Sequence, residues 1–350
     1  MTKPGAEGTT ACKVKKAAYP ALLAGSAAFA FLIFTISIST GIFRVPLVTV
    51  VKILLAEVYP LEQTWSNSAG IAVIAIRLPR TLAAMLIGAA LSLSGASYQS
   101  MFKNPMVSPD ILGVSAGASV GAAAAILVNA ELVWIETGAF LGGLAAVSLT
   151  MLIPKLVRNN SIVILVLAGI IVGGLATSVM SVIRMLADPT TTLADITYWT
   201  MGSLARVKMK ELTVIGPLIV TGLVVLLLLR YRLNVLSLGD NEARSLGVNV
   251  SRTRFIVVAC ATLLTASSVC VAGVIGWVGL VIPHISRMIV GIDNKKMLPV
   301  SMFLGGSFMM VIDLLARTLA AVDIPISVLT GIIGAPFFFL ILLKQKRRIL

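Results

Sequence analysis

Charged side chains are scarce in this 350-residue chain: they make up 12% of it, whereas 58% of the residues are hydrophobic. A soluble protein of this length needs far more polar surface to cover so large a core. Disordered, collagen-like and disulfide-scaffold proteins are excluded by the same composition. The sequence therefore predicts an all-α protein that crosses a membrane many times.

Cysteine and histidine are nearly absent, with three and one residues respectively. Cys12, Cys260 and Cys270 form no CxxC pair, and two of them fall in apolar stretches, which favours a packing role. A single histidine, His284, cannot build a His-based metal cluster or a Ser–His–Asp triad. We therefore expect no metal site, no cofactor and no catalytic residue, and we expect His284 to bond backbone carbonyls freed by Pro283.

A phosphate-binding loop is also missing. No lysine follows a glycine anywhere in the chain, so the pattern GxxxxGK[ST] cannot occur and any ATP-driven work needs a partner. Carboxylates inside apolar stretches, which ion-coupled carriers commonly use, are rare as well. Asp313 is deep enough in such a stretch to qualify, and Arg317, four residues later, is its expected ion-pair partner.

Long apolar runs are what the chain has in their place. Nearly all of them reach the roughly 20 residues that a helix needs to cross a hydrocarbon core about 30 Å thick, and one, 277–292, is shorter and interrupted. The ten expected spans are 18–41, 81–102, 111–129, 132–153, 161–186, 212–229, 255–275, 277–292, 298–316 and 324–343. A transmembrane domain is thus expected over 18–343, with tails at 1–17 and 344–350.

The net charge of +14 comes from basic residues in short clusters between the apolar runs, which indicates membrane topology rather than nucleic-acid binding. With alternating spans, a cytoplasmic N-terminus puts most Lys and Arg on the inside, so we expect both termini in the cytoplasm. Some basic residues are left at the external face, where they are candidates for a docking surface: Arg77, Arg80, Arg184, Arg206, Lys208, Lys210 and Arg317.

Five stretches resemble, in order, the FecCD-type permeases, which are the membrane subunits of ATP-binding-cassette (ABC) importers for iron–siderophore complexes, haem and cobalamin. They are RLPRTLAAMLIGAALSLSGASYQSMFKNPMVSPDILGVSAGASVGA at 77–122, YWTMGSL at 198–204, GDNEARSLGVNVSRTR at 239–254, GVIGWVGLVIPHISRMIVGIDNKKMLP at 273–299 and DIPISVLTGIIGAPFFFLILL at 323–343. The resemblance covers nearly the whole chain from about residue 20.

The resemblance implies a type II ABC importer permease fold with ten helices, in the plasma membrane of a bacterium or archaeon. It also implies a second permease copy, identical or not, two ATPase subunits on the cytoplasmic side, a substrate-binding protein outside and a metal-chelate substrate. A ferric siderophore is the broadest expectation, followed by haem and cobalamin. The alternatives are an ion-coupled secondary transporter, which needs no ATPase, and a membrane assembly subunit, which moves no substrate.

A polar segment within the cytoplasmic loop at about 231–254 resembles the coupling helices that insert into the ATPase. From the residues themselves, Asp240 or Asn241 can cap a short helix and Gly247 can end it in a left-handed conformation. Leu246 and Val248 are then the expected apolar contacts, and the alternative is a solvated connector. The residues assigned to coupling are Gly239, Asp240, Glu242, Ala243, Arg244, Leu246, Gly247 and Val248.

Arg77, Arg80 and Arg317 match family arginines that meet acidic residues of the binding protein. A guanidinium keeps its charge and pairs bidentately with carboxylates, which suits that role. Two alternatives stay open, contact with lipid headgroups and an ion pair inside the chain.

The end of the second span carries a candidate cytoplasmic gate, because Asn104, Pro105 and Met106 match the family's Asn-Pro-Leu segment. A structural helix stop, in which Asn104 bonds freed backbone groups, is the alternative. Candidates for lining the translocation path are Gln99, Thr190, Thr191 and Thr192. For Gln99 the alternative is a hydrogen bond to a neighbouring helix. For the threonines it is a segment that Tyr198 and Trp199 anchor at the interface.

Overall fold

The chain is helical throughout the residues that its computed structural model describes, which are 7–41, 43–159 and 161–349, and these contain no strand. By length and composition, seven helices can cross a membrane, and shorter apolar helices fill the remaining predicted spans, so the predicted fold class is confirmed. The ten helices at the predicted spans are α1 (Glu7–Ser39), α4 (Leu78–Phe102), α5 (Val114–Leu127), α6 (Leu132–Leu156), α7 (Ile162–Leu186), α9 (Met209–Leu228), α12 (Val250–Ala272), α13 (Val278–Val290), α14 (Asn294–Ala316) and α15 (Ile326–Ile349).

Short elements connect these helices. They are α2 (Leu47–Ala56), α3 (Asn67–Ile71), η1 (Ala72–Arg77), η2 (Pro109–Leu112), α8 (Thr192–Met201), α10 (Arg230–Leu238) and α11 (Asp240–Ser245). The π-helical element η1 joins α3 to α4, and the Leu78 amide donates to the Val73 carbonyl. Pro79 follows directly and has no amide hydrogen, so the ordinary α-helical ladder cannot continue through this point.

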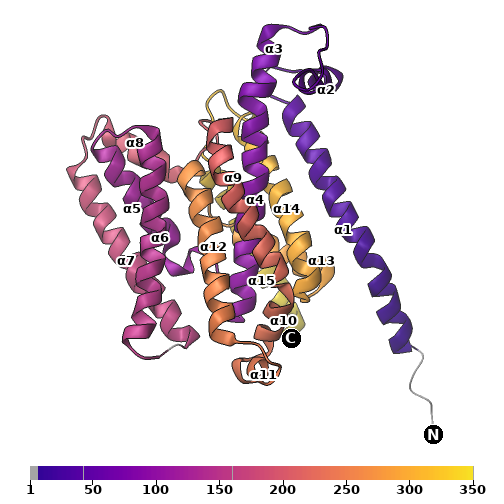
Figure 1. Cartoon of the computed structure of the whole chain (residues 1–350), viewed down its shortest axis with the longest axis vertical. Helices are drawn as coiled ribbons and strands as arrows, with labels where there is room; N and C mark the ends of the chain where they lie inside the picture. Colours follow the sequence, from indigo (N-terminus) through magenta and orange to yellow (C-terminus); the bar gives the residue numbers. More distant parts are fainter. Residues whose placement is uncertain (1–6, 42, 160, 350) are drawn as a thin grey trace.

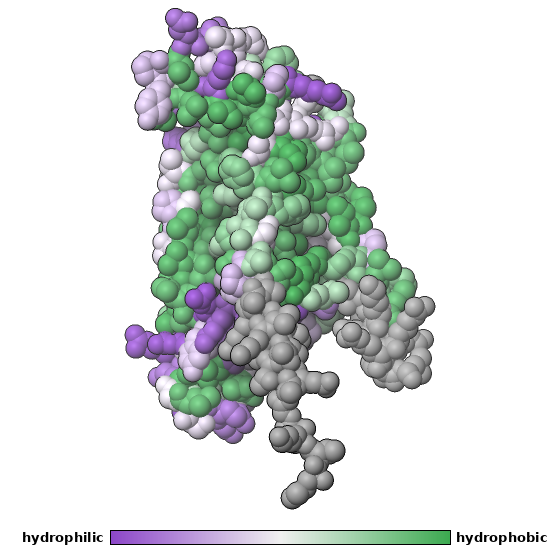
Figure 2. Space-filling model, turned by 90° about the vertical axis from the view of Figure 1, so that its right-hand side faces the viewer, coloured by the Kyte–Doolittle hydropathy of each residue, from purple (hydrophilic) through white to green (hydrophobic). Residues whose placement is uncertain are grey.

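Two opposite ends of the bundle carry the connecting elements. Figure 1 shows the start of α1, the end of α15 and α11 at one end, and α2, α3 and α8 at the other. A hydrophobic band lies between polar patches at the two ends in Figure 2. Helical backbone extends into both predicted tails, because α1 starts at Glu7 and α15 runs to Ile349, although the apolar stretch of α1 begins at Tyr19.

Helix α4 is the buried centre of the bundle and packs against α9, α12, α13 and α14. Its approach to α14 depends on Gly88 and Gly305, since a Cβ on either glycine would overlap the other's carbonyl oxygen. A Cβ on Gly95 would likewise overlap the carbonyl oxygen of Gly279 in α13. Small residues that allow backbones to touch are a main source of packing energy between helices in a bilayer.

We predict that Gly88→Ala destabilises the chain by about 1–3 kcal/mol, because the added methyl group forces α4 and α14 apart. The measurement is thermal unfolding of the purified protein in detergent. Gly174→Ala in α7 is the matched control: a Cβ there meets nothing within 4 Å, so removing a helical glycine should leave stability unchanged or raise it by up to about 1 kcal/mol. Equal midpoints for the two variants would contradict this account of the α4–α14 contact.

Candidate functional site

The short helix α11 lies at one end of the bundle and connects α10 to α12 (Figure 1). Gly247 ends it with φ 78°, as predicted. The Gly247 amide donates to the Arg244 carbonyl at 3.0 Å and the Val248 amide to the Ala243 carbonyl at 2.9 Å, which together form a Schellman motif. The predicted side-chain cap is wrong: the N-cap is Gly239, because Asp240 instead accepts two bonds from Arg254 Nη2, at 2.7 and 2.9 Å.

One face of α11 is anchored and the other is open. Ala243 is fully buried and packs with Val235, Leu236 and Val250, and Val248 lies partly buried against this cluster rather than facing outward. On the other face Arg244 is exposed and Leu246 is 59% exposed. The arrangement presents an apolar side chain and a cation on a helix whose orientation is held from behind.

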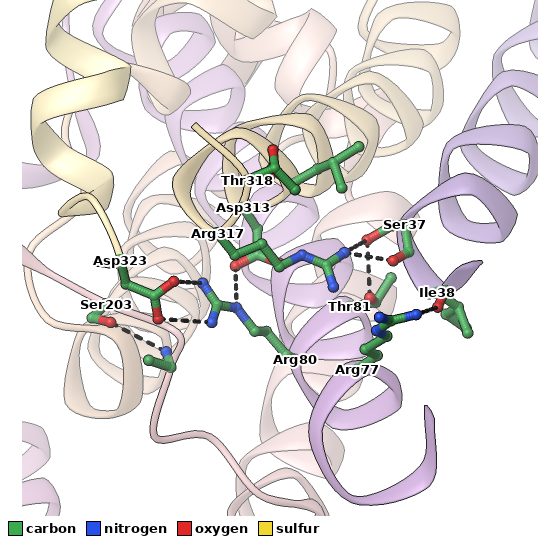
Figure 3. Close-up of polar contacts among 12 residues, drawn as sticks. Ser37, Ile38, Arg77, Arg80, Thr81, Ser203, Asp313, Arg317, Thr318 and Asp323 are labelled. Atoms are coloured by element: carbon green, nitrogen blue, oxygen red, sulfur yellow. Dashed lines mark hydrogen bonds and ion pairs between the residues drawn. The ribbon is translucent and has the colours of Figure 1, made fainter. Parts of the chain in front are cut away.

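At the opposite end of the bundle, Arg80 of α4 lies between two carboxylates (Figure 3). Its Nε donates to Asp313 Oδ1 of α14 at 2.6 Å, and its two terminal nitrogens donate to Asp323 at 3.0 and 3.3 Å. Asp313 is fully buried and Asp323 is 28% exposed. The expected partner of Asp313, Arg317, also forms an ion pair with it, with its Nε 3.5 Å from Asp313 Oδ2, so the predicted pair is confirmed and Arg80 is a second, closer cation.

The other two predicted docking arginines also bond inside the chain. Arg317 donates through Nη2 to the Ser37 carbonyl at 2.5 Å and to the Ser37 hydroxyl at 2.7 Å. Arg77 donates to the carbonyls of Ile38 and Ser39 at the end of α1 and to the carbonyl of Phe43 in the segment that follows. The exposed fractions of Arg77, Arg80 and Arg317 are 4, 6 and 9%. The structure thus displays the internal alternative, and docking through these guanidinium groups requires the network to open.

The segment after α4 forms a helix stop. Lys103 ends the helix with φ 53°, and Asn104 Oδ1 accepts the Met106 amide at 2.9 Å, as expected for an asparagine that bonds freed backbone. Asn104, Pro105 and Met106 are all exposed. Their role as a gate stays a prediction.

Gln99 is 3% exposed and bonds across helices, which is the alternative to a path-lining role. Its amide nitrogen donates to the carbonyls of Val107 and Gly279, each at 3.1 Å, and its oxygen accepts from Arg287 at 2.5 Å. The prediction for His284 is wrong: its buried Nδ1 has no hydrogen-bond partner among the described residues, and its ring lies 6.2 Å from that of Phe338.

Thr190 and Thr191 bond Asp188, in the turn between α7 and α8. Asp188 Oδ1 accepts the Thr190 amide at 2.8 Å, the Thr190 hydroxyl at 2.5 Å and the Thr191 amide at 3.1 Å. Hydrogen bonds from Thr190 lower the pKa of Asp188, so the carboxylate stays charged. Thr190 and Thr191 are exposed at the end of the bundle that carries α8, whereas Thr192 is buried at the start of α8.

Contacts from α8 to the start of α15 complete this end of the bundle. The Tyr198 hydroxyl donates to the Asp323 carbonyl at 3.4 Å, and the Ser327 hydroxyl to the Met201 carbonyl at 2.7 Å. Asp323 therefore joins α4, α8 and α15, a role that the sequence did not reveal. Among the described residues, no three His, Cys, Asp or Glu side chains gather closely enough to hold a metal ion.

The model of the FecCD transport family matches residues 29–344. The molybdate import system permease protein MolB of Haemophilus influenzae is 35% identical over 334 residues, which is 94% of this chain and 97% of that protein. A Helicobacter pylori protein named as a probable permease of an iron chelatin transport system is 37% identical over 280 residues, which is 80% of this chain and 85% of that protein. A solved structure, described as an inward-facing conformation of a metal-chelate type ABC transporter, superposes on this chain with a TM-score of 0.84 at 34% sequence identity. The superposition covers 93% of this chain and 99% of the chain in that structure.

We predict that Arg80→Gln destabilises the chain by about 3–5 kcal/mol, because it leaves the buried carboxylate of Asp313 without its closest cation. Unfolding of the purified protein in detergent measures the change. The double variant with Asp313→Asn should recover part of the loss, since no charge is then left unpaired at that contact. Arg206→Gln, which alters an exposed arginine, is the control and should change nothing. A strong effect of the control, or none of Arg80→Gln, would refute the importance of the ion pair.

Proposed function

The chain belongs to the FecCD transport family and is a permease subunit of an ABC importer. We propose that its helix α11 couples ATP hydrolysis by the ATPase subunits to the opening and closing of the translocation path. Permeases of this kind carry no ATPase of their own and work with ATPase subunits, a substrate-binding protein and a second permease copy. The observation that supports the proposal best is the exposed pair Arg244 and Leu246 on a short helix held by buried Ala243.

The end of the bundle that carries α11 is proposed to face the cytoplasm of a bacterium or archaeon. The start of α1 and the end of α15 lie at that end, so both termini are cytoplasmic in this orientation. The excess of Lys and Arg in the segments at that end supports it, since basic residues near span ends favour the cytoplasmic side. Fusion of a reporter enzyme active only in the cytoplasm to the C-terminus tests the assignment, and an inactive, fully expressed fusion would reverse it.

Docking of the binding protein is proposed at the outer end, on Arg77, Arg80 and Arg317. Because Asp323 is partly exposed and occupies both terminal nitrogens of Arg80, an acidic side chain of the binding protein can compete for the same bidentate position. Equal capture of the binding protein by a folded Arg80→Gln variant and by the wild type would remove Arg80 from this role.

The path is proposed to run from the outer threonines Thr190 and Thr191 to the stop formed by Asn104 and Met106. The threonines lie exposed beside α8, and Met106 is 53% exposed at the α11 end. A cysteine at position 106 that a membrane-impermeant thiol reagent modifies from the cytoplasmic side at the same rate with and without ATP would argue against a gate there.

The substrate is proposed to be a metal chelate, with a ferric siderophore first and haem and cobalamin next. The iron chelatin relative and the superposed metal-chelate transporter support this class. The molybdate relative covers nearly the whole chain, so molybdate is the candidate outside the metal-chelate class.

For coupling, we predict that Leu246→Asp abolishes co-purification of the ATPase while leaving the permease folded, because it puts a charge in the expected apolar contact. Val157→Asp is the matched control: Val157 is an exposed aliphatic residue just after α6, outside α11, with an exposed fraction of 57% against 59% for Leu246. Capture of the ATPase is measured by affinity purification from membranes. If Leu246→Asp captures as much ATPase as the control, α11 is not the coupling element.

For transport, we predict that vesicles containing the permease, its captured ATPase and the binding protein accumulate a ferric hydroxamate chelate only when ATP is inside. Haem, cobalamin and molybdate are measured in parallel with labelled iron, cobalt and molybdenum. Uptake of molybdate alone would support the importer function and replace the metal chelate with molybdate as the substrate. Uptake driven by an ion gradient without ATP would contradict the importer function and support the alternative, an ion-coupled secondary transporter.

A further inference from the structure

A continuous groove follows the contact between α6 and α12 from the α11 end into the hydrophobic band. It consists of two adjoining cavities of about 210 and 340 Å³, which share Met151 and Phe255. The first cavity lies at the helix ends and the second farther along the same two helices. The groove is thus polar at its mouth and apolar along its length.

The mouth of the groove is basic and rich in hydrogen-bond donors. Lys155 in the last turn of α6 and Arg254 in the second turn of α12 line it, together with the hydroxyls of Ser161 and Ser251. Ser161 is the N-cap of α7, and Ser251 is the second residue of α12, so two helix N-termini add positive potential. None of the residues that line this cavity is acidic.

One N–H group of Arg254 at this mouth is not used in a hydrogen bond to the described residues. Its Nη2 holds both oxygens of Asp240, the first residue of α11, while its Nε is buried and has no partner among the described residues. A buried guanidinium N–H without an acceptor costs free energy unless a ligand supplies one. The donor is therefore suited to an acceptor oxygen that enters from the groove.

Beyond the mouth, most of the side chains that line the groove are apolar, and the others are Ser148, Cys260 and Thr262. Leu144, Val147 and Met151 come from α6, and Phe255, Ala259 and Leu263 come from α12. Its length follows the helix axes, which cross the hydrocarbon region. This surface fits an acyl chain lying parallel to the helices.

We infer that the groove binds an anionic phospholipid, with its phosphate at Lys155 and Arg254 and one acyl chain along α6 and α12. Basic pockets between membrane helices at the cytoplasmic side are suited to anionic headgroups. A soluble phosphate would use the mouth alone and leave the apolar length unfilled. The inference does not depend on what the protein transports, because it rests on the groove's own chemistry.

The test is thermal unfolding of the purified full chain in detergent with added phosphatidylglycerol, compared with phosphatidylcholine of the same acyl chains and with inorganic phosphate. We expect phosphatidylglycerol to raise the midpoint, and the other two to raise it much less. Lys155→Gln should weaken the apparent affinity for phosphatidylglycerol about fivefold, since one basic residue near an anionic lipid contributes about that factor. Retention of the lipid in native mass spectrometry gives an independent readout.

Two further variants separate the parts of the site. Ala259→Trp should abolish the preference for phosphatidylglycerol while both cations remain, because the indole fills the apolar length. Arg232→Gln, an exposed arginine of α10 that does not line the groove, is the matched control and should retain the wild-type response. Each variant is first shown to unfold at the wild-type midpoint without lipid.

Equal stabilisation by phosphatidylcholine or by inorganic phosphate would overturn the proposal, and so would an undiminished response in both Lys155→Gln and Ala259→Trp.

Discussion

Charge inside a low-dielectric layer has to be neutralised in place, and this constraint determines much of the half of the bundle that lies opposite α11. Asp313 has no exposed surface, so α14 can occupy its position only if cations reach the carboxylate, and Arg317 at the end of α14 is one of them. Arg80 provides the closer cation, and its second contact, with Asp323, ties the segment before α15 to α4. Arg317 extends the network to Ser37 of α1. One buried carboxylate thus determines how four segments meet.

The spans were predictable because membrane helices follow a rule of length and composition that needs no partner information. The end of α11 was predictable for a similar local reason, since Gly247 can adopt a positive φ at low cost. The two short outer helices α2 and α3 were missed, because neither reaches membrane-spanning length.

The pairing of the polar groups could be read only in part from spacing. Arg317 is four residues from Asp313, which favours a helical pair, yet Arg80, 233 residues away in sequence, makes the shorter contact. Asp240 likewise bonds Arg254 instead of capping its own helix. In both cases the sequence identified which groups need partners, and the packing of distant helices decided which partner is nearest. The same limit explains why Gln99 could not be assigned between a path and a neighbouring backbone.

The contact between Arg80 and Asp313 also constrains how this sequence can change over time. Loss of Arg80 alone leaves the buried carboxylate of Asp313 with only the longer contact to Arg317, and loss of Asp313 alone leaves Arg80 with only Asp323, so an intermediate with one substitution is selected against more strongly than the sequence with both. Positions 80 and 313 are therefore expected to vary together among homologous chains, with Arg and Asp either both present or both replaced. Asp323 has an exposed edge and can be solvated, so position 323 is expected to vary more freely.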